Sequence, residues 1–89
     1  MIITILYDNE AQGEGLQADW GFAALIEAHG HTILFDTGAN ASVLLGNMDA
    51  LNISIDSLEE IFISHDHWDH TGGLPAILER RPVPVYVPD

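Results

Sequence analysis

The chain has 89 residues, with fourteen acidic and two basic side chains and a net charge of −12 at pH 7. A chain of this length forms at most one domain, and a surface of this charge repels nucleic-acid phosphates. It has no cysteine for a disulfide or a thiolate metal site, and no apolar run approaches the ~20 residues of a membrane span. No secretory signal pattern opens it, so we expect a soluble, cytoplasmic protein. Its 47% hydrophobic content argues against disorder.

The first part of the sequence predicts three strands. Residues 1–7 are almost continuously apolar, which predicts a strand that is buried on both faces. Residues 8–19 contain turn-forming residues and predict a loop. The apolar runs 20–28 and 31–35 flank a turn signal at His29-Gly30, and together they predict a hairpin.

A helix and a further strand are predicted next. Asn40 is placed to cap a helix over residues 41–51, where apolar side chains recur at helical spacing. Asp56 or Ser57 begins a short helical turn that reaches Glu60. Residues 61–64 then read as a strand.

The last part of the sequence predicts a second helix and an edge strand. Residues 71–80 read as a helix, in which Pro75 is tolerated because the first turn needs no intrahelical donor. Pro82 ends this helix, and residues 83–87 form the last strand. Pro84 removes one backbone donor from that strand, which suits a sheet edge or a strand start. The element order predicts a single α/β (α+β) domain over residues 1–89.

The densest chemistry lies between the strand at 61–64 and the helix at 71–80, in the run His65-Asp66-His67-Trp68-Asp69-His70. Histidine nitrogen and aspartate oxygen are ligands that zinc-like divalent cations prefer. In extended backbone His65 and His67 point to the same side, so they can bind one ion. Asp69 and His70 follow after the chain turns and can face a second ion. The small residues after them allow the backbone to approach a ligand closely.

This loop, His65-x-His67-x-Asp69-His70 followed by Thr71-Gly72-Gly73-Leu74, resembles the signature loop of the metallo-β-lactamase superfamily. Other segments resemble one branch of it, which includes dihydropterin-ribofuranosylaminobenzene-phosphate synthases: Leu6-Tyr7-Asp8-Asn9, Gly21-Phe22, Leu25-Ile26-Glu27 and Ile33-Leu34-Phe35-Asp36-Thr37-Gly38. The similarity covers essentially the whole chain. Asp66 departs from that branch, which usually has glycine there, and this carboxylate could compete for metal or bind nothing.

The resemblance implies that the chain is the N-terminal half of a four-layer αβ/βα sandwich, with a mixed sheet and helices on one face. It implies a metal-dependent hydrolase that acts on a small molecule. His65 and His67 match half of one metal position, and Asp69 and His70 match half of a second. Asp69 would also orient the attacking hydroxide, which makes it the candidate catalytic residue. Nitrogen and oxygen ligands admit zinc first, with manganese or iron as alternatives, and up to two ions in a completed site.

The remaining ligands of the family lie beyond Asp89, so the site needs completion. The chain is then a fragment, a homodimer, or one half that pairs with a separate C-terminal-half chain. A half-sandwich exposes an apolar face, which favours an oligomer and most simply a two-fold dimer.

Two other functions are open. Asp36-Thr37-Gly38 also resembles the active-site motif of dimeric aspartic proteases, whereas the superfamily resemblance gives Asp36 a structural role as an acceptor of backbone hydrogen bonds. The loop is also compatible with a metal-binding or assembly module without catalysis.

Several side chains have a plain structural interpretation. His29 and His31 are expected to be an exposed pair at a turn rather than extra ligands. Trp20 is expected in the core or an interface. Trp68 could line a substrate pocket or pack under the loop, and the sequence does not separate the two.

Overall fold

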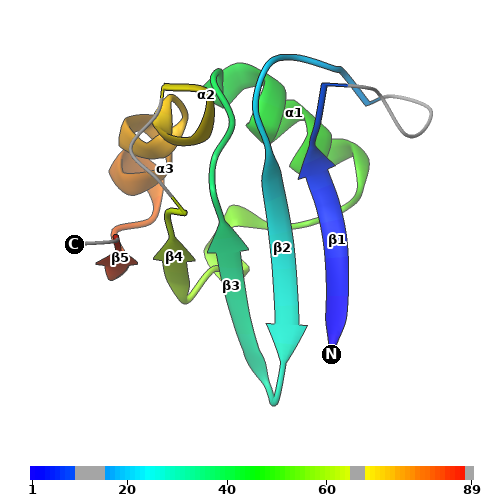
Figure 1. Ribbon diagram of the computed structural model, residues 1–89. Helices are drawn as coiled ribbons and strands as arrows, with labels where there is room; N and C mark the ends of the chain where they lie inside the picture. Colours follow the sequence, from blue (N-terminus) through cyan, green and yellow to red (C-terminus); the bar gives the residue numbers. More distant parts are fainter. Residues whose placement is uncertain (10–15, 65–67, 88–89) are drawn as a thin grey trace.

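The computed structural model describes residues 1–9, 16–64 and 68–87, with Trp68 and Asp69 described by their backbone alone. Five strands form one mixed sheet in the order β1-β2-β3-β4-β5 (Figure 1). The strands are β1 (Ile2–Tyr7), β2 (Ala23–Ala28), β3 (His31–Phe35), β4 (Glu60–Phe62) and β5 (Val85–Tyr86). The first three pair antiparallel and the last three pair parallel. The predicted α/β (α+β) class and the hairpin at 20–35 are confirmed.

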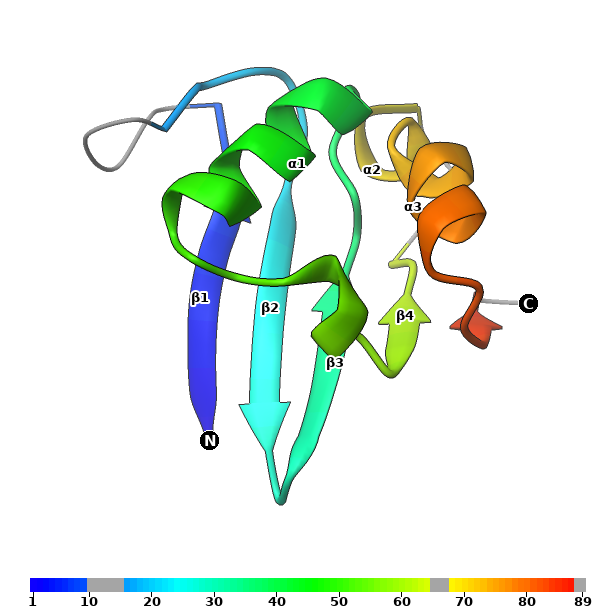
Figure 2. The same ribbon diagram turned by 180° about the vertical axis from the view of Figure 1, so that it is seen from behind.

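The helices lie on one face of this sheet (Figure 2), as predicted. They are α1 (Ala41–Ala50), the 3₁₀ turn η1 (Ile55–Ser57), α2 (Trp68–Thr71) and α3 (Leu74–Arg80). In the described part of the chain, none of them is long and apolar enough to cross a membrane.

Helix α1 begins where the sequence predicts it. The Asn40 side chain accepts a hydrogen bond of 2.8 Å from the Ser42 amide, which satisfies one of the donors that a helix start leaves unpaired. Leu44 and Met48, four residues apart, are buried against the sheet. This helix covers the first strands, and its N-terminus lies beside the loop that follows β3 (Figure 2).

The core is formed by the sheet face that meets the helices. Leu25, Leu34 and Ile61 stand side by side in the strand register, and all three are buried. Leu44 and Ile77 pack onto this row from α1 and α3.

The opposite face of the sheet is bare. Ile3 is 57% exposed, and Phe62 and Tyr86 are each 45% exposed and stack with ring centroids 5.3 Å apart. Burial of the first strand on both faces was therefore a wrong prediction, because β1 is an edge strand with a bare outer face. An apolar run indicates what a strand can bury, and it does not indicate which layers are present to cover it.

The predicted helix over residues 71–80 is divided in two at Gly72 and Gly73. A Cβ atom at Gly72 would lie 2.1 Å from the carbonyl oxygen of Ala39, so the glycine permits a close approach of two loops that local helix signals do not reveal. The short turn predicted from Asp56 or Ser57 to Glu60 occurs earlier, as η1, because Ser54 caps it. The last strand shortens to β5, at the predicted sheet edge.

Candidate metal centre

The loops that follow β3 and β4 meet at the carboxyl ends of these two neighbouring parallel strands (Figure 1). The Asp36 amide continues the pairing and donates to the Phe62 carbonyl at 2.8 Å. Ligand sites in sheets with parallel strands commonly form at this end. Strand pairing therefore brings Asp36 and Thr37 next to Ser64 and His70.

Asp36 is buried at this junction, 1% exposed and in a left-handed conformation with φ of 61°. One carboxylate oxygen accepts the Ser64 amide at 2.7 Å, and the other accepts the Ser64 hydroxyl at 2.6 Å. The structural role expected for Asp36 is thereby confirmed. An aspartic protease needs a carboxylate that faces substrate, so this geometry does not support the protease hypothesis.

The second Asp36 oxygen also lies 2.7 Å from Nδ1 of His70. A ring N–H at Nδ1 donates to this carboxylate, which leaves Nε2 as the acceptor nitrogen on the other side of the ring. Histidines that bind metals are usually oriented in this way, because a carboxylate fixes the tautomer and raises the basicity of the ring. Sequence reasoning did not find this contact. The signal available was the position of Asp36 at the end of a strand that neighbours the metal loop.

The backbone of His70 is held as firmly as its side chain. The Thr37 amide donates to the His70 carbonyl at 2.8 Å, and the Thr37 hydroxyl donates to the same oxygen at 3.0 Å. That hydroxyl in turn accepts the Gly73 amide at 3.1 Å. A Cβ atom at Gly73 would lie 2.9 Å from the Thr37 carbonyl oxygen, so the glycine allows the two loops to approach each other closely.

Tyr7 packs against the loop that follows β3. A Cβ atom at Gly38, whose φ is 72°, would lie 2.5 Å from the Tyr7 ring. The Tyr7 hydroxyl donates to Asp19 at 2.6 Å and accepts the Asn40 amide at 3.1 Å. Burial, together with the Asp19 hydrogen bond, raises the pKa of Tyr7 to about 12. One buried phenol thus joins the β1–β2 connection, the loop after β3 and the start of α1.

Only part of the predicted ligand set can be placed. His65, Asp66 and His67 lie outside the described residues, as do the side chains of Trp68 and Asp69. Among the described residues, no three histidine, cysteine, aspartate or glutamate side chains are grouped to hold a metal. Of the predicted ligands the structure places His70, and metal binding by the loop stays a prediction.

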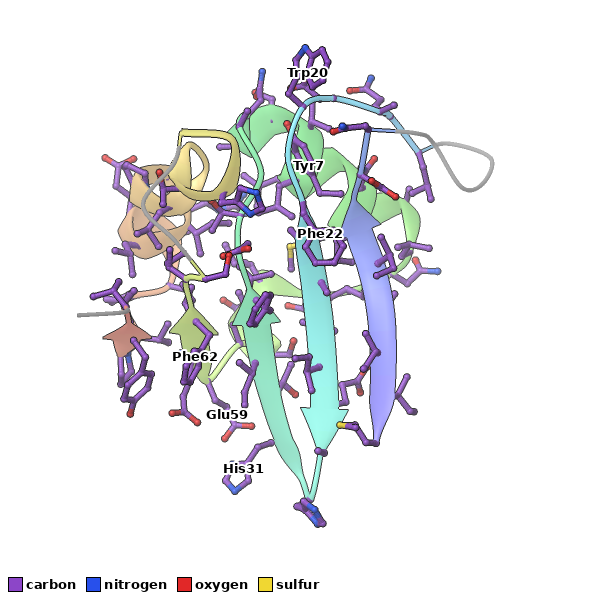
Figure 3. All side chains as sticks on the ribbon, viewed as in Figure 1. Tyr7, Trp20, Phe22, His31, Glu59 and Phe62 are labelled. Carbon is purple, nitrogen blue, oxygen red and sulfur yellow. The ribbon has the colours of Figure 1, made fainter. Side chains whose placement is uncertain are left out.

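His31 lies beside Glu59 at the opposite end of the sheet (Figure 3). His31 Nδ1 is 3.2 Å from a carboxylate oxygen of Glu59, and the Thr32 amide donates to the other oxygen at 2.9 Å. The Thr32 hydrogen bond, with His31, holds the pKa of Glu59 below its usual range. His29 is exposed at the turn with φ of 52°. Both histidines are exposed at the turn, as the sequence indicates.

A model of the metallo-beta-lactamase superfamily matches residues 20–89. The 7,8-dihydropterin-6-methyl-4-(beta-D-ribofuranosyl)-aminobenzene-5'-phosphate synthase of Methanocaldococcus jannaschii is 35% identical over 91 residues, which cover 96% of this chain and 31% of that protein. A hydroxyacylglutathione hydrolase of Methylobacillus flagellatus is 33% identical, over 72% of this chain and 24% of its own length.

Solved structures agree with these sequence matches. A metal-dependent hydrolase of the beta-lactamase superfamily superposes with a TM-score of 0.67 and 38% identity, over 81% of this chain and 25% of that one. The metallo-beta-lactamase SMB-1, bound to 2-mercaptoethanesulfonate, has a TM-score of 0.68 and 25% identity, over 93% of this chain and 32% of its own. This chain therefore spans about a third or less of each protein compared.

Proposed function

The chain belongs to the metallo-beta-lactamase superfamily, and on that basis we propose that it is the metal-binding portion of a metal-dependent hydrolase. The observation that supports this most directly is the 2.7 Å contact between Asp36 and His70 Nδ1. A buried carboxylate that orients a histidine at the end of a His-x-His-x-Asp-His loop suits a metal ligand better than a structural histidine.

The proposed ligands are His65, His67, Asp69 and His70. Their nitrogen and oxygen donors suit zinc, with manganese or iron as alternatives, and up to two ions once the site is complete. Bound cations would supply water activation near neutral pH and polarisation of the oxygen of a carbonyl or phosphoryl group.

The residues of this chain would then orient the ligand side chains and hold them in place. Asp36 keeps the proton of His70 on Nδ1, so that Nε2 is the nitrogen presented to an ion. Thr37 fixes the His70 backbone through two hydrogen bonds to its carbonyl. Asp69, as the catalytic residue of the proposal, would orient the attacking oxygen toward a small-molecule substrate. A site held in place before the substrate arrives loses little energy to reorganisation during the reaction.

We also propose that a second half completes the site and covers the bare face of the sheet. Its apolar side chains, Ile3, Phe62 and Tyr86 among them, are exposed, and contiguous exposed apolar surface usually marks an interaction site. The second half is supplied by a further part of the same protein, by a second copy of the chain, or by a separate chain that carries the C-terminal half.

A non-catalytic metal-binding or assembly module is the second candidate. It is favoured by the ligand count of the loop. A catalytic zinc usually takes three protein ligands and a water, so four ligands would complete one position but not two.

The decisive experiment joins zinc analysis to native mass measurement. We expect the wild-type protein to retain zinc after desalting and the His70→Ala variant to lose at least tenfold in zinc affinity. Asp36→Asn should lose about 10- to 100-fold, as is usual when the partner of a ligand histidine is removed. His29→Ala, an exposed histidine outside the loop, is the matched control. Equal zinc retention by wild type and His70→Ala would contradict the proposal.

The mass of the zinc-loaded species then shows how the site is completed. Two ions per dimer would indicate that two copies share the ligands, whereas two ions per monomer would indicate that one chain holds both ions. Hydrolysis of a generic phosphodiester or lactone separates the two candidate functions. Activity that disappears in His67→Ala supports the hydrolase, whereas zinc binding without turnover supports the module. Activity that is unchanged in His67→Ala comes from a contaminant.

A further inference from the structure

A cavity of about 530 Å³ opens in the helical layer, between the end of α1, the connection from α1 to β4, and the end of α3. Figure 2 shows these three segments together on the face of the sheet that carries the helices. The volume lies within the range of pockets that hold small molecules, roughly 300–1,000 Å³. The described lining includes neither Asp36 nor His70, so the cavity is distinct from the candidate metal centre.

The side of the cavity that adjoins the core is apolar. Met48 is buried there, and Ile53 and Ile55 are half-buried and pack against the core. These side chains are held by their neighbours, so they present a fixed apolar surface to the cavity. An aliphatic group that lay on this surface would be removed from water, which favours its binding.

Charges of both signs line the same cavity. Asp49 lies in the last turn of α1, Asp56 in η1 and Arg80 in the last turn of α3. Within the described part of the chain, none of these three side chains makes an ion pair or a hydrogen bond. The other arginine, Arg81, has a structural partner, because its Nε donates to the Leu58 carbonyl at 3.0 Å. The two signs of charge thus face one cavity without neutralising each other.

The backbone that carries these charges is fixed by hydrogen bonds. At the end of α1 the Ile53 amide donates to the Met48 carbonyl at 2.8 Å. At the start of η1 the Asp56 amide donates to the Ser54 hydroxyl at 3.2 Å. A ligand in the cavity would therefore order side chains but little backbone, which lowers the entropic cost of binding.

We propose that this cavity binds a small zwitterion with an apolar side chain, such as a free aliphatic α-amino acid. Its carboxylate would accept hydrogen bonds from the guanidinium of Arg80. Its ammonium group would donate to Asp49 or Asp56, where the negative end of the α1 dipole also favours a cation. Its aliphatic group would lie on Met48 and Ile53. A ligand with one charge alone would meet repulsion from the opposite part of the rim, so the rim selects a ligand that carries both.

The test titrates L-leucine into nitrogen-labelled protein and follows the amide chemical shifts, which report both the location and the affinity of binding. We expect saturable shifts at residues 48–56 and around Arg80. Two probes separate the charges: isocaproate, which lacks the ammonium group, and isopentylamine, which lacks the carboxylate. Each should bind about fivefold more weakly than leucine, the effect of one exposed ion pair at the upper end of its usual range.

Variants assign each charge to its partner. Arg80→Gln should weaken leucine binding about fivefold without weakening isopentylamine, which has no carboxylate. The double variant Asp49→Asn, Asp56→Asn should weaken leucine by a similar factor without weakening isocaproate. Glu79→Gln is the matched control, because it changes the charge of α3 by one unit at an exposed residue outside the cavity lining, and leucine binding should be unchanged. Circular dichroism melting curves establish that each variant is folded.

Three results would overturn the zwitterion site: no saturable shifts with leucine, equal affinity for leucine and the two singly charged probes, or leucine binding that is unchanged in Arg80→Gln. Shifts at the cavity that follow protein concentration and not leucine would also overturn it, and would assign the cavity to a contact between copies. These measurements need no metal. The zwitterion site therefore stands or falls independently of the zinc test.

Discussion

Neighbouring residues Ile61 and Phe62 show how different the two faces of this sheet are. Ile61 points toward the helices and is fully buried, while Phe62 lies on the opposite face and is 45% exposed. Both are large and apolar, so hydrophobic pattern alone gives them equal standing. The difference comes from the layers: α1 and α3 cover one face, and no element in the described part of the chain covers the other (Figures 1 and 2). The hydrophobic stabilisation of this domain is therefore one-sided.

The largest expected effect tests this difference directly. Ile61→Ala should lower the free energy of unfolding by about 2–5 kcal/mol, because it opens a cavity in the packed core. Phe62→Ala should lower it by only about 0.5–1.5 kcal/mol in the monomer, since the ring is 45% exposed and its loss mainly removes the stacking contact with Tyr86. Urea unfolding followed by circular dichroism measures both values. Equal losses would mean that the bare face is covered in solution.

The next effect concerns the close packing of the two loops that meet at Ala39 and Gly72. Gly72→Ala should cost about 1–3 kcal/mol or more, because its Cβ would overlap the Ala39 carbonyl. Gly46→Ala is the matched control, since Gly46 is exposed in α1 with open space around the added methyl group. That change should stabilise the protein by about 0.5–1 kcal/mol. A neutral Gly72→Ala variant would show that the crossing loops can separate without loss.

The smallest effect is expected in alkaline solution, where buried Tyr7 is compared with Tyr86 on the bare face. Tyr7 titrates near pH 10 when unfolded and near 12 when folded, so the folded state holds the proton more tightly. Its contribution to stability is complete below pH 10 and is lost as the pH rises toward 12. Tyr7→Phe should flatten this decline in the free energy of unfolding. Tyr86→Phe should retain most of it, and the reverse result would locate the effect on the bare face.

Local signals predicted the local structure well. The strand at 31–35 and the start of α1 behind Asn40 occur where the sequence indicates, because a turn and a cap are each determined by a few adjacent residues. The bare face was anticipated from the resemblance, whereas the exposure of β1 was not. Gly72 was predicted to be part of a helix. The steric contact that requires a glycine there involves Ala39, which is distant in the sequence, so the local pattern does not reveal it.

The candidate site follows the same rule. The motif identified His70 as a candidate ligand, but its contact with Asp36 depends on two strands pairing in parallel across 34 positions. Asp36 was assigned a structural role on the right grounds, without its most informative partner. Trp20 was expected in the core or an interface from its residue type, and the structure excludes the core, since the side chain is 64% exposed. Hydrophobicity does not reveal that hydrogen bonds of the backbone hold a segment while its side chain stays exposed.

The contact between Asp36 and His70 also has a consequence for the order of folding. It joins positions 34 residues apart, whereas the β2–β3 hairpin closes over a short turn. Contacts between distant positions carry the larger loop-closure cost, so the hairpin is expected to form early and the site late. A ligand bound at His70 would select the state in which β4 is already docked, and so would slow its detachment. An ion bound at His70 would then stabilise the part of the sheet that assembles last.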